Sequence, residues 1–230
     1  MMSLKKSRLY WYLKRKRRKK NISHQGYSQY GQDLACLELL QEIDSGTFID
    51  IGANDGITGS NSLLFEKKGW QGICVEPHPL IFSKLKDARD CNCLNACITS
   101  KDSKVDFLAV HGAANMLSGI ESFMDQKHKE RIDQEIAKKG GSTERIEIEA
   151  LSPSTLIDRF SLSKIDFLSV DTEGCELPIL KSFLSASIIP KPKVISVENG
   201  SRTSSLFEYL TTVGYKLYKC VGCDEIYLKD

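Results

Sequence analysis

Two glycines and the acids around them form the clearest chemical pattern in the chain. Residues 48–62 read FIDIGANDGITGSNS, so a short apolar run ends in a turn that contains Gly52 and Gly56. Glycine permits a tight turn there and lets the backbone approach a ligand closely. The spacing G-x-x-x-G differs from the G-x-G-x-x-G pattern that cradles a dinucleotide pyrophosphate. Asp50 and Asp55 flank the turn, and two carboxylates would repel a phosphate but suit a cationic ligand.

A further acid follows the next apolar run, where Glu76 ends the strand in the segment ICVEPHP. An acid at this place in a strand–helix–strand unit can accept hydrogen bonds from both ribose hydroxyls of an adenosine. S-adenosylmethionine joins an adenosine to a sulfonium and an ammonium, so its charges fit this loop better than those of NAD. The loop and Glu76 together predict a nucleoside site. The alternative is a structural turn followed by an incidental surface glutamate.

Two acids leave a third apolar run, IDFLSVDTEG at residues 165–174. Ligands of open α/β sheets bind at the carboxyl ends of the strands, so we expect Asp171 and Glu173 to face the same crevice as Gly52. Group transfer to a hydroxyl needs alignment and removal of the hydroxyl proton, and a carboxylate can do either. The competing interpretation makes Glu173 a helix cap and Asp171 a loop anchor.

Two other side chains complete the candidate set. Glu198 ends the apolar run at 194–198 and could hold a divalent metal together with Asp171; hard oxygen ligands of this kind suit Mg²⁺. His111 begins an irregular segment from which it could reach an acceptor, so it is a further candidate catalytic residue.

The elements that must position these residues alternate along the chain. Helical and strand periods follow one another with short joints from residue 33 onward, which is typical of strand–helix–strand units and a parallel sheet. We predict helices at 33–44, 62–68, 80–88, 126–139, 154–160, 176–184 and 204–213, and strands at 47–51, 72–75, 91–98, 104–110, 145–151, 165–170, 194–198, 215–220 and 225–228.

One segment interrupts this rhythm. Residues 111–143 contain a loop of Gly, Ala, Asn and Ser and then a charged helix, which is too long for an ordinary joint. Insertions of this kind usually carry binding function or act as lids. Without repeats or internal linkers, the chain divides into a basic tail at 1–24 and one domain at 25–230 that includes the insertion.

The charge of the chain is unevenly distributed. The net charge of +2 combines 32 Lys and Arg with 30 Asp and Glu, yet residues 1–32 hold ten of the basic residues and no acid. The rest is acidic, which argues against nucleic-acid binding by the domain. The tail could be a solvated segment, an anchor to anionic lipid, or a nuclear-import or nucleic-acid-contacting segment. It lacks the apolar stretch of a secretory signal, so we expect a cytoplasmic protein. Peripheral attachment to a membrane is the alternative.

Eight cysteines without a secretory signal are typical of reduced thiols in a cytosolic setting. Cys91, Cys93 and Cys97 form one group, and Cys220 and Cys223 form another. Zinc would require the groups to meet with tetrahedral geometry. Because Cys93 and Cys97 would share one face of the strand predicted at 91–98, burial as small apolar side chains is the favoured interpretation.

Four motifs in order resemble the FkbM family of methyltransferases: YSQYGQD, FIDIGANDG, VEPHP and SVDTEGCE, with the resemblance covering about residues 27–230. It implies the Rossmann-like class I methyltransferase fold, an α/β architecture whose mostly parallel seven-stranded sheet has helices on both faces. It also implies that Asp50, Gly52, Asn54 and Gly56 contact the methionine part of S-adenosylmethionine and that Glu76 contacts the ribose.

The resemblance further implies methylation of a hydroxyl on a glycan, sugar or secondary metabolite. Two alternatives remain at this stage: an N-methyltransferase acting on protein or RNA, and a non-catalytic module that binds S-adenosylmethionine. An Asn/Asp-Pro-Pro-Tyr strand end, usual in enzymes that methylate the amino groups of bases, is absent, and DTEG stands in its place. The oligomeric state does not follow from the sequence.

Overall fold

The computed structural model describes residues 26–185, 188–200 and 202–230. The tail predicted at 1–24 lies outside these residues, so its three interpretations remain predictions. No helix in the described part of the chain is long and apolar enough to cross a membrane.

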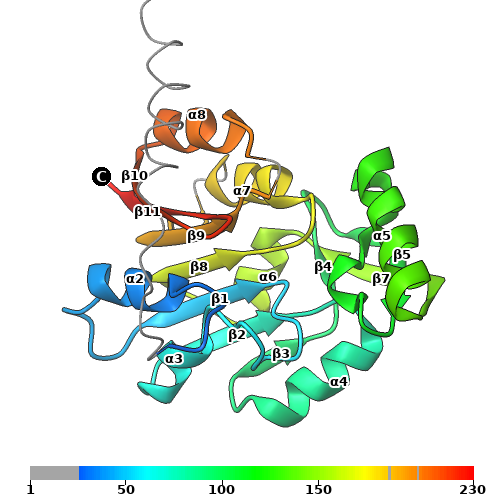
Figure 1. The fold of residues 1–230 in the computed structure, drawn as a ribbon. Coiled ribbons are helices and arrows are strands. Elements are labelled where there is room, and N and C mark those ends of the chain that lie inside the picture. Colours follow the sequence, from blue (N-terminus) through cyan, green and yellow to red (C-terminus); the bar gives the residue numbers. More distant parts are fainter. Residues whose placement is uncertain (1–25, 186–187, 201) are drawn as a thin grey trace, which may run out of the picture.

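The main sheet has seven strands in the order β10-β11-β9-β8-β1-β2-β3 (Figure 1). Strands β3, β2, β1, β8 and β9 are parallel to one another, and β11 and β10 add an antiparallel edge. The predicted Rossmann-like α/β fold with a mostly parallel seven-stranded sheet is therefore confirmed. The strands are β1 (Thr47–Ile51), β2 (Gln71–Val75), β3 (Asn92–Leu94), β8 (Phe167–Val170), β9 (Val194–Glu198), β10 (Tyr215–Val221) and β11 (Asp224–Lys229).

Alternating side chains give each face of this sheet its own core, because successive residues of a strand point to opposite faces. In β1, Phe48 packs with one helical layer while Ile49 and Ile51 pack with the other. The first layer contains α2 (Gln32–Leu39), α3 (Leu63–Lys67) and α4 (Pro79–Ala88), and the second contains α6 (Pro153–Arg159), α7 (Glu176–Ser185) and α8 (Ser205–Thr212). Helix α2 is shorter than predicted, since the chain turns at Leu40.

A second sheet of four strands, in the order β4-β7-β5-β6, packs into the same core as the second helical layer. It contains β4 (Cys97–Ile98), β5 (Ser103–His111), β6 (Gly119–Ile120) and β7 (Ser142–Leu151). The long antiparallel ladder of β5 and β7 extends to the pair His111 and Ser142. The predicted insertion is thus an excursion between two paired strands, and its helix α5 (Gln126–Lys139) lies where the sequence placed it.

The single strand predicted at 91–98 is wrong. The chain forms β3 and β4 instead, which belong to different sheets. Between them the Asn95 side-chain amide donates hydrogen bonds to the carbonyls of Glu76 and Pro77, both at 2.8 Å. A side chain bonded in this way competes with the regular ladder and turns the chain. Cys93 and Cys97 therefore do not share one strand face, although Cys97 is buried as an apolar side chain would be.

Gly72 in β2 offers a test of the core between two central strands. The Phe48 ring lies over its Cα, and a Cβ built on Gly72 would come within 2.2 Å of the ring. We expect Gly72→Ala to lower the free energy of unfolding by about 1–3 kcal/mol, as overpacking does. Urea denaturation measures this loss. Phe48→Leu in the same background should recover part of it, and additive losses would show that the two residues do not clash.

Candidate active site

A cavity of about 560 Å³ opens at the carboxyl ends of the central strands, a size typical of small-molecule sites. Most of the residues singled out from the sequence line it: Asp50, Gly52, Asn54, Glu76, Asp171, Glu173 and Glu198. Gly56 and His111 are not in its lining. The strand ends and loops that bring these residues together lie far apart in the sequence.

Gly52 sits where the ends of β1 and β8 approach most closely. Its φ is +83°, and a Cβ there would lie 1.7 Å from the carbonyl oxygen of Asp171. The Asp171 amide also donates to the carbonyl of Ile51 at 3.0 Å. A side chain at position 52 would force these two strand ends apart, so the first glycine of the loop is required by the backbone itself.

Asp50 and Asp55, which we expected to face a cationic ligand, have different surroundings. Asp55 accepts hydrogen bonds from the amides of Ile57 and Thr58 and from the Thr58 hydroxyl, at 2.7–2.9 Å, and it is absent from the cavity lining. It shapes the turn, as short acidic side chains often do. Asp50 is buried and accepts a hydrogen bond from the Ser62 hydroxyl at 2.5 Å. Burial raises the pKa of Asp50.

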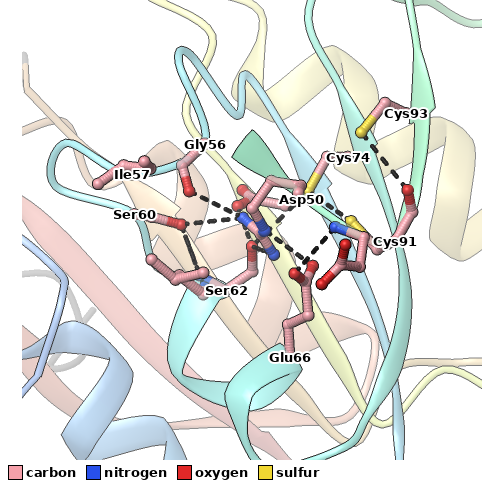
Figure 2. A network of polar contacts seen from close by, with 12 residues as sticks. Asp50, Gly56, Ile57, Ser60, Ser62, Glu66, Cys74, Cys91 and Cys93 are labelled. Carbon is pink, nitrogen blue, oxygen red and sulfur yellow. Dashed lines mark hydrogen bonds and ion pairs between the residues drawn. The ribbon is translucent and has the colours of Figure 1, made fainter. Parts of the chain in front are cut away.

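A buried arginine that the sequence analysis did not single out holds the loop from behind. The Arg89 guanidinium lies 2.8 Å from the Glu66 carboxylate and donates to the carbonyl of Gly56 at 3.2 Å. It also donates to the hydroxyls of Ser60 and Ser62. Figure 2 shows this network converging between the loop and α3. A Cβ on Gly56 would lie 2.7 Å from the Arg89 side chain, so the second glycine makes room for this arginine.

Glu76 leaves β2 at the opposite side of the loop and is also buried. Its two carboxylate oxygens accept the amides of His78 at 2.8 Å and Asn54 at 3.0 Å. Each oxygen keeps a further lone pair that can accept a ligand hydroxyl. Burial raises the pKa of Glu76 to about 7. The same side chain therefore fixes the loop and offers two oxygens to the cavity.

Three carboxyls from neighbouring strands meet at the other end of the cavity. Glu198 of β9 pairs in register with Asp224 of β11, and Asp171 follows the last residue of β8. Burial, and next the charge of Glu198, raise the pKa of Asp171 well above its ordinary value. Burial and the charge of Glu176 raise the pKa of Glu198 as well. Protonated carboxyls are the expected response to crowding of like charges away from water.

Glu173 connects this end of the cavity to the insertion. It adopts a positive φ of 55°, which is uncommon for a residue other than glycine. Its carboxylate lies 3.3 Å from Nη1 of Arg131 and 3.8 Å from Nδ1 of His128, both on α5. Burial and the charge of Glu198 raise the pKa of Glu173 to about 7, and Arg131 opposes this rise. Glu173 therefore does not cap α7. The Glu176 carboxylate does so, because it accepts hydrogen bonds from the backbone amides of Thr172 and Gly174.

His111 lies away from these carboxyls. Its Nε2 is 3.2 Å from the Glu144 carboxylate, and its ring packs edge-on against that of His78 at 5.2 Å. Glu144 belongs to β7, the partner strand of β5, and His78 precedes α4, so both contacts hold His111 outside the cavity lining.

An N-terminal strap, residues 26–31, covers part of the cavity. Asp33 is fully buried and accepts hydrogen bonds from the amide of Tyr27 and from the amide and hydroxyl of Ser28. Ser28 also forms a bridge with Gly59 beyond the glycine loop. The sequence analysis did not single out the tyrosines of this strap individually, because nothing in the local pattern places them at the cavity. The strap contributes Tyr27, Ser28, Gln29 and Tyr30.

The predicted metal ligands form a pair and not a larger set. Among residues 26–185, 188–200 and 202–230, no group of three His, Cys, Asp or Glu side chains is arranged to hold a metal ion. Asp171 and Glu198 instead share a side-chain hydrogen bond. A divalent cation would have to displace this hydrogen bond, and the described residues supply no third His, Cys, Asp or Glu ligand to the pair, so the two carboxyls as arranged do not fit a metal site.

Comparison with known families gives one match, to the model of the methyltransferase FkbM domain, over residues 50–217. No curated protein matches the chain. Solved structures that align with it include a TehB-like SAM-dependent methyltransferase from Corynebacterium glutamicum. The two sequences are 12% identical, the alignment covers 97% of this chain and 99% of that chain, and the TM-score is 0.41. Another is a putative RNA methyltransferase from Pyrococcus horikoshii. It is 12% identical, the alignment covers 97% of this chain and 98% of that chain, and the TM-score is 0.37.

The Arg89 network yields a stability prediction. Arg89→Leu would leave the half-buried Glu66 carboxylate without its ion-pair partner and the buried Asp50 carboxyl without a nearby cation, so we expect a loss of about 3–5 kcal/mol in the free energy of unfolding. Urea denaturation checks this value. Lys104→Ala is the control, because Lys104 pairs with Glu147 on the exposed surface and should cost nothing measurable. Equal effects of the two substitutions would contradict a bracing role for Arg89.

Proposed function

The chain belongs to the FkbM methyltransferase family, and we propose that it transfers the methyl group of S-adenosylmethionine to a hydroxyl of a glycan or secondary metabolite. One observation carries the proposal. A single cavity joins the Glu76 end, suited to a nucleoside, to the Asp171 end, suited to removing a proton from a hydroxyl. Binding and chemistry therefore share one enclosed space, as alignment of two reactants requires.

The cofactor end of the cavity would be held by the chain's own polar groups. Glu76 accepts the ribose hydroxyls, while the turn at Gly52 and Asn54 presents its backbone to the methionine part of the ligand. S-adenosylmethionine, when bound, supplies an electrophilic methyl group on a sulfonium. The carboxyls that surround the cavity favour a cation, which supports this cofactor over a nicotinamide dinucleotide with its two phosphates.

The acceptor end would carry the proton transfer. A carboxylate oxygen of Asp171 takes the proton of the acceptor hydroxyl, and Glu198 holds or releases the proton that the two carboxyls share. A raised pKa makes Asp171 a stronger base once ionised, and a nearby positive charge favours that ionised form. Glu173 borders the same space and, through Arg131, connects it to the insertion.

Two further parts of the proposal concern the surroundings of the enzyme. The acidic domain supports a cytoplasmic protein that does not bind nucleic acid. The basic residues before position 33 support peripheral attachment to an anionic membrane, where lipid-linked glycans would be accessible. A radiolabelled methyl-transfer assay with sugars, lipid-linked glycans and amine acceptors tests the acceptor class, and exclusive labelling of amines would contradict it.

Glu76 generates the first prediction about the cofactor. Glu76→Ala should weaken the binding of S-adenosylhomocysteine by about 1.5–3 kcal/mol, the cost of removing a charged hydrogen-bond partner. Isothermal titration calorimetry measures the change. Unchanged affinity would mean that the ribose is held elsewhere.

The pKa of about 7 adds a pH dependence. Glu76 must be ionised to accept both ribose hydroxyls, so affinity should increase from pH 6 to pH 8 with release of a proton, and then level off. In the absence of ligand, folding stability depends on pH in the opposite direction. Because the pKa of Glu76 is raised in the folded state, its contribution to folding stability is present at acid pH and is lost as the pH rises through about 7. Glu76→Gln is the matched control and should abolish the pH dependence of binding.

Asp171 should matter for turnover more than for cofactor binding. Asp171→Asn keeps size and hydrogen bonding but removes the charge that a base needs, so we expect the methyl-transfer rate to fall by about 10²-fold or more. Single-turnover kinetics with saturating cofactor isolates this step. Full activity of the variant would exclude Asp171 from the mechanism and leave Glu173 and Glu198, which line the same cavity, as the next candidates.

Chelation separates a carboxylate base from a metal site at Asp171 and Glu198. Activity of the wild type in EDTA, together with an inactive Asp171→Asn variant, is the result expected for a base. Loss of activity in EDTA and its recovery with Mg²⁺ would show instead that the paired carboxyls hold a metal ion.

A further inference from the structure

Arg131 is a cation in an otherwise acidic cavity. It lies on α5, in the excursion between β5 and β7, and its side chain borders the end of the cavity near Glu173. Among the described residues it is the one Lys, Arg or His in the lining. The ionisable residues that share the lining with it, apart from tyrosines and cysteines, are Asp50, Glu76, Asp171, Glu173, Glu198 and Asp224.

The ion pair with Glu173 uses little of the Arg131 side chain. Nη1 of Arg131 lies 3.3 Å from the Glu173 carboxylate, and 59% of the arginine side chain is exposed against 17% of the glutamate side chain. A guanidinium carries five N–H donors in a planar fork that matches a carboxylate or a phosphate with two hydrogen bonds. The glutamate therefore orients the guanidinium while much of its surface remains accessible.

The charges near Arg131 on α5 include Lys127, which lies one turn before it on the exposed side of the helix, and Glu135, which lies one turn after it and pairs with Lys139 at 2.5 Å. The His128 ring also faces Glu173, at 3.8 Å. In contrast, Lys129 and Arg145 both pair with Glu121 outside the cavity lining. The positive charge near the cavity is thus concentrated at Arg131.

We infer that Arg131 binds an anionic group, a carboxylate or a phosphate, on the acceptor whose hydroxyl is methylated. This inference rests on the proposed function and adds the charge of the substrate to it. The other wall of the cavity carries the carboxyls of Asp171, Glu198 and Asp224 and, among the described residues, no cation with which an anion could pair. An anionic acceptor can therefore enter in one orientation, with its charge at Arg131 and a hydroxyl towards Asp171. The excursion between β5 and β7 acts as the specificity element of the enzyme.

Sugar binding to the full-length protein tests this inference. Glucuronate, glucose 6-phosphate and neutral glucose are titrated into protein saturated with S-adenosylhomocysteine, and saturation-transfer NMR gives the dissociation constants. We expect at least one anionic sugar to bind tenfold or more tightly than glucose, and the two anions distinguish carboxylate from phosphate recognition. Arg131→Ala should remove this preference and leave the affinity for S-adenosylhomocysteine unchanged. Arg145→Ala is the matched control and should retain the preference.

Three results would overturn the inference. The first is binding of glucose and both anionic sugars with equal affinity, or binding of none of them. The second is an anion preference that survives in Arg131→Ala. The third is a loss of S-adenosylhomocysteine affinity in Arg131→Ala, which would show that this arginine holds the carboxylate of the cofactor. Failure of the wild type to bind S-adenosylhomocysteine would instead overturn the proposed function, so the two failures are distinguishable.

Discussion

The buried guanidinium of Arg89 is the interaction on which the site depends. It is 5% exposed, and it connects the carbonyl of Gly56, two serine hydroxyls and the Glu66 carboxylate from a position at the end of α4. A buried cation is costly unless every side of it is compensated, and this one is surrounded by acceptors. Because these acceptors belong to the glycine loop and α3, Arg89 ties the loop to this helix. The Asn54 amide can then meet Glu76, and Gly52 can meet the end of β8.

At the opposite end of the cavity, acids gather, and among the described residues no buried cation compensates them. Asp171, Glu198 and Asp224 come from adjacent strands, and burial raises the pKa of each of them, with repulsion by neighbouring carboxylates adding to the rise for Asp171 and Glu198. The repulsion in such a cluster is relieved by a cationic ligand or by the uptake of a proton. A fold that places acids at several strand ends is therefore prepared for a sulfonium cofactor and for proton removal. The same crowding makes Arg131 distinctive, since it is a positive charge placed by an element outside the main sheet.

The sequence predicted those parts of the structure that depend on local periodicity. The alternation of strands and helices predicted a mostly parallel sheet and the charged helix α5. The glycine loop and the acid after the next strand predicted that Gly52, Asn54 and Glu76 would lie at one site. The alternation could not show that residues 91–98 divide between two sheets, because Asn95 turns the chain through contacts with a distant segment. Arg89 and Arg131 were missed for the same reason. Their partners lie far away in sequence, and a lone arginine, at the end of a helix like Arg89 or inside one like Arg131, carries no local signal. Asp55 was misjudged because its spacing suits a ligand contact and a turn cap equally.

Calorimetric titration of the wild-type protein is the most direct test of the central claim, that the loop braced by Arg89 and the carboxyl of Glu76 form a site for S-adenosylmethionine. S-adenosylmethionine and its demethylated product should each bind once per chain with a dissociation constant on the order of micromolar, about −8 kcal/mol. NAD should give no detectable heat of binding under the same conditions. Saturable binding of NAD without binding of S-adenosylmethionine would contradict the account.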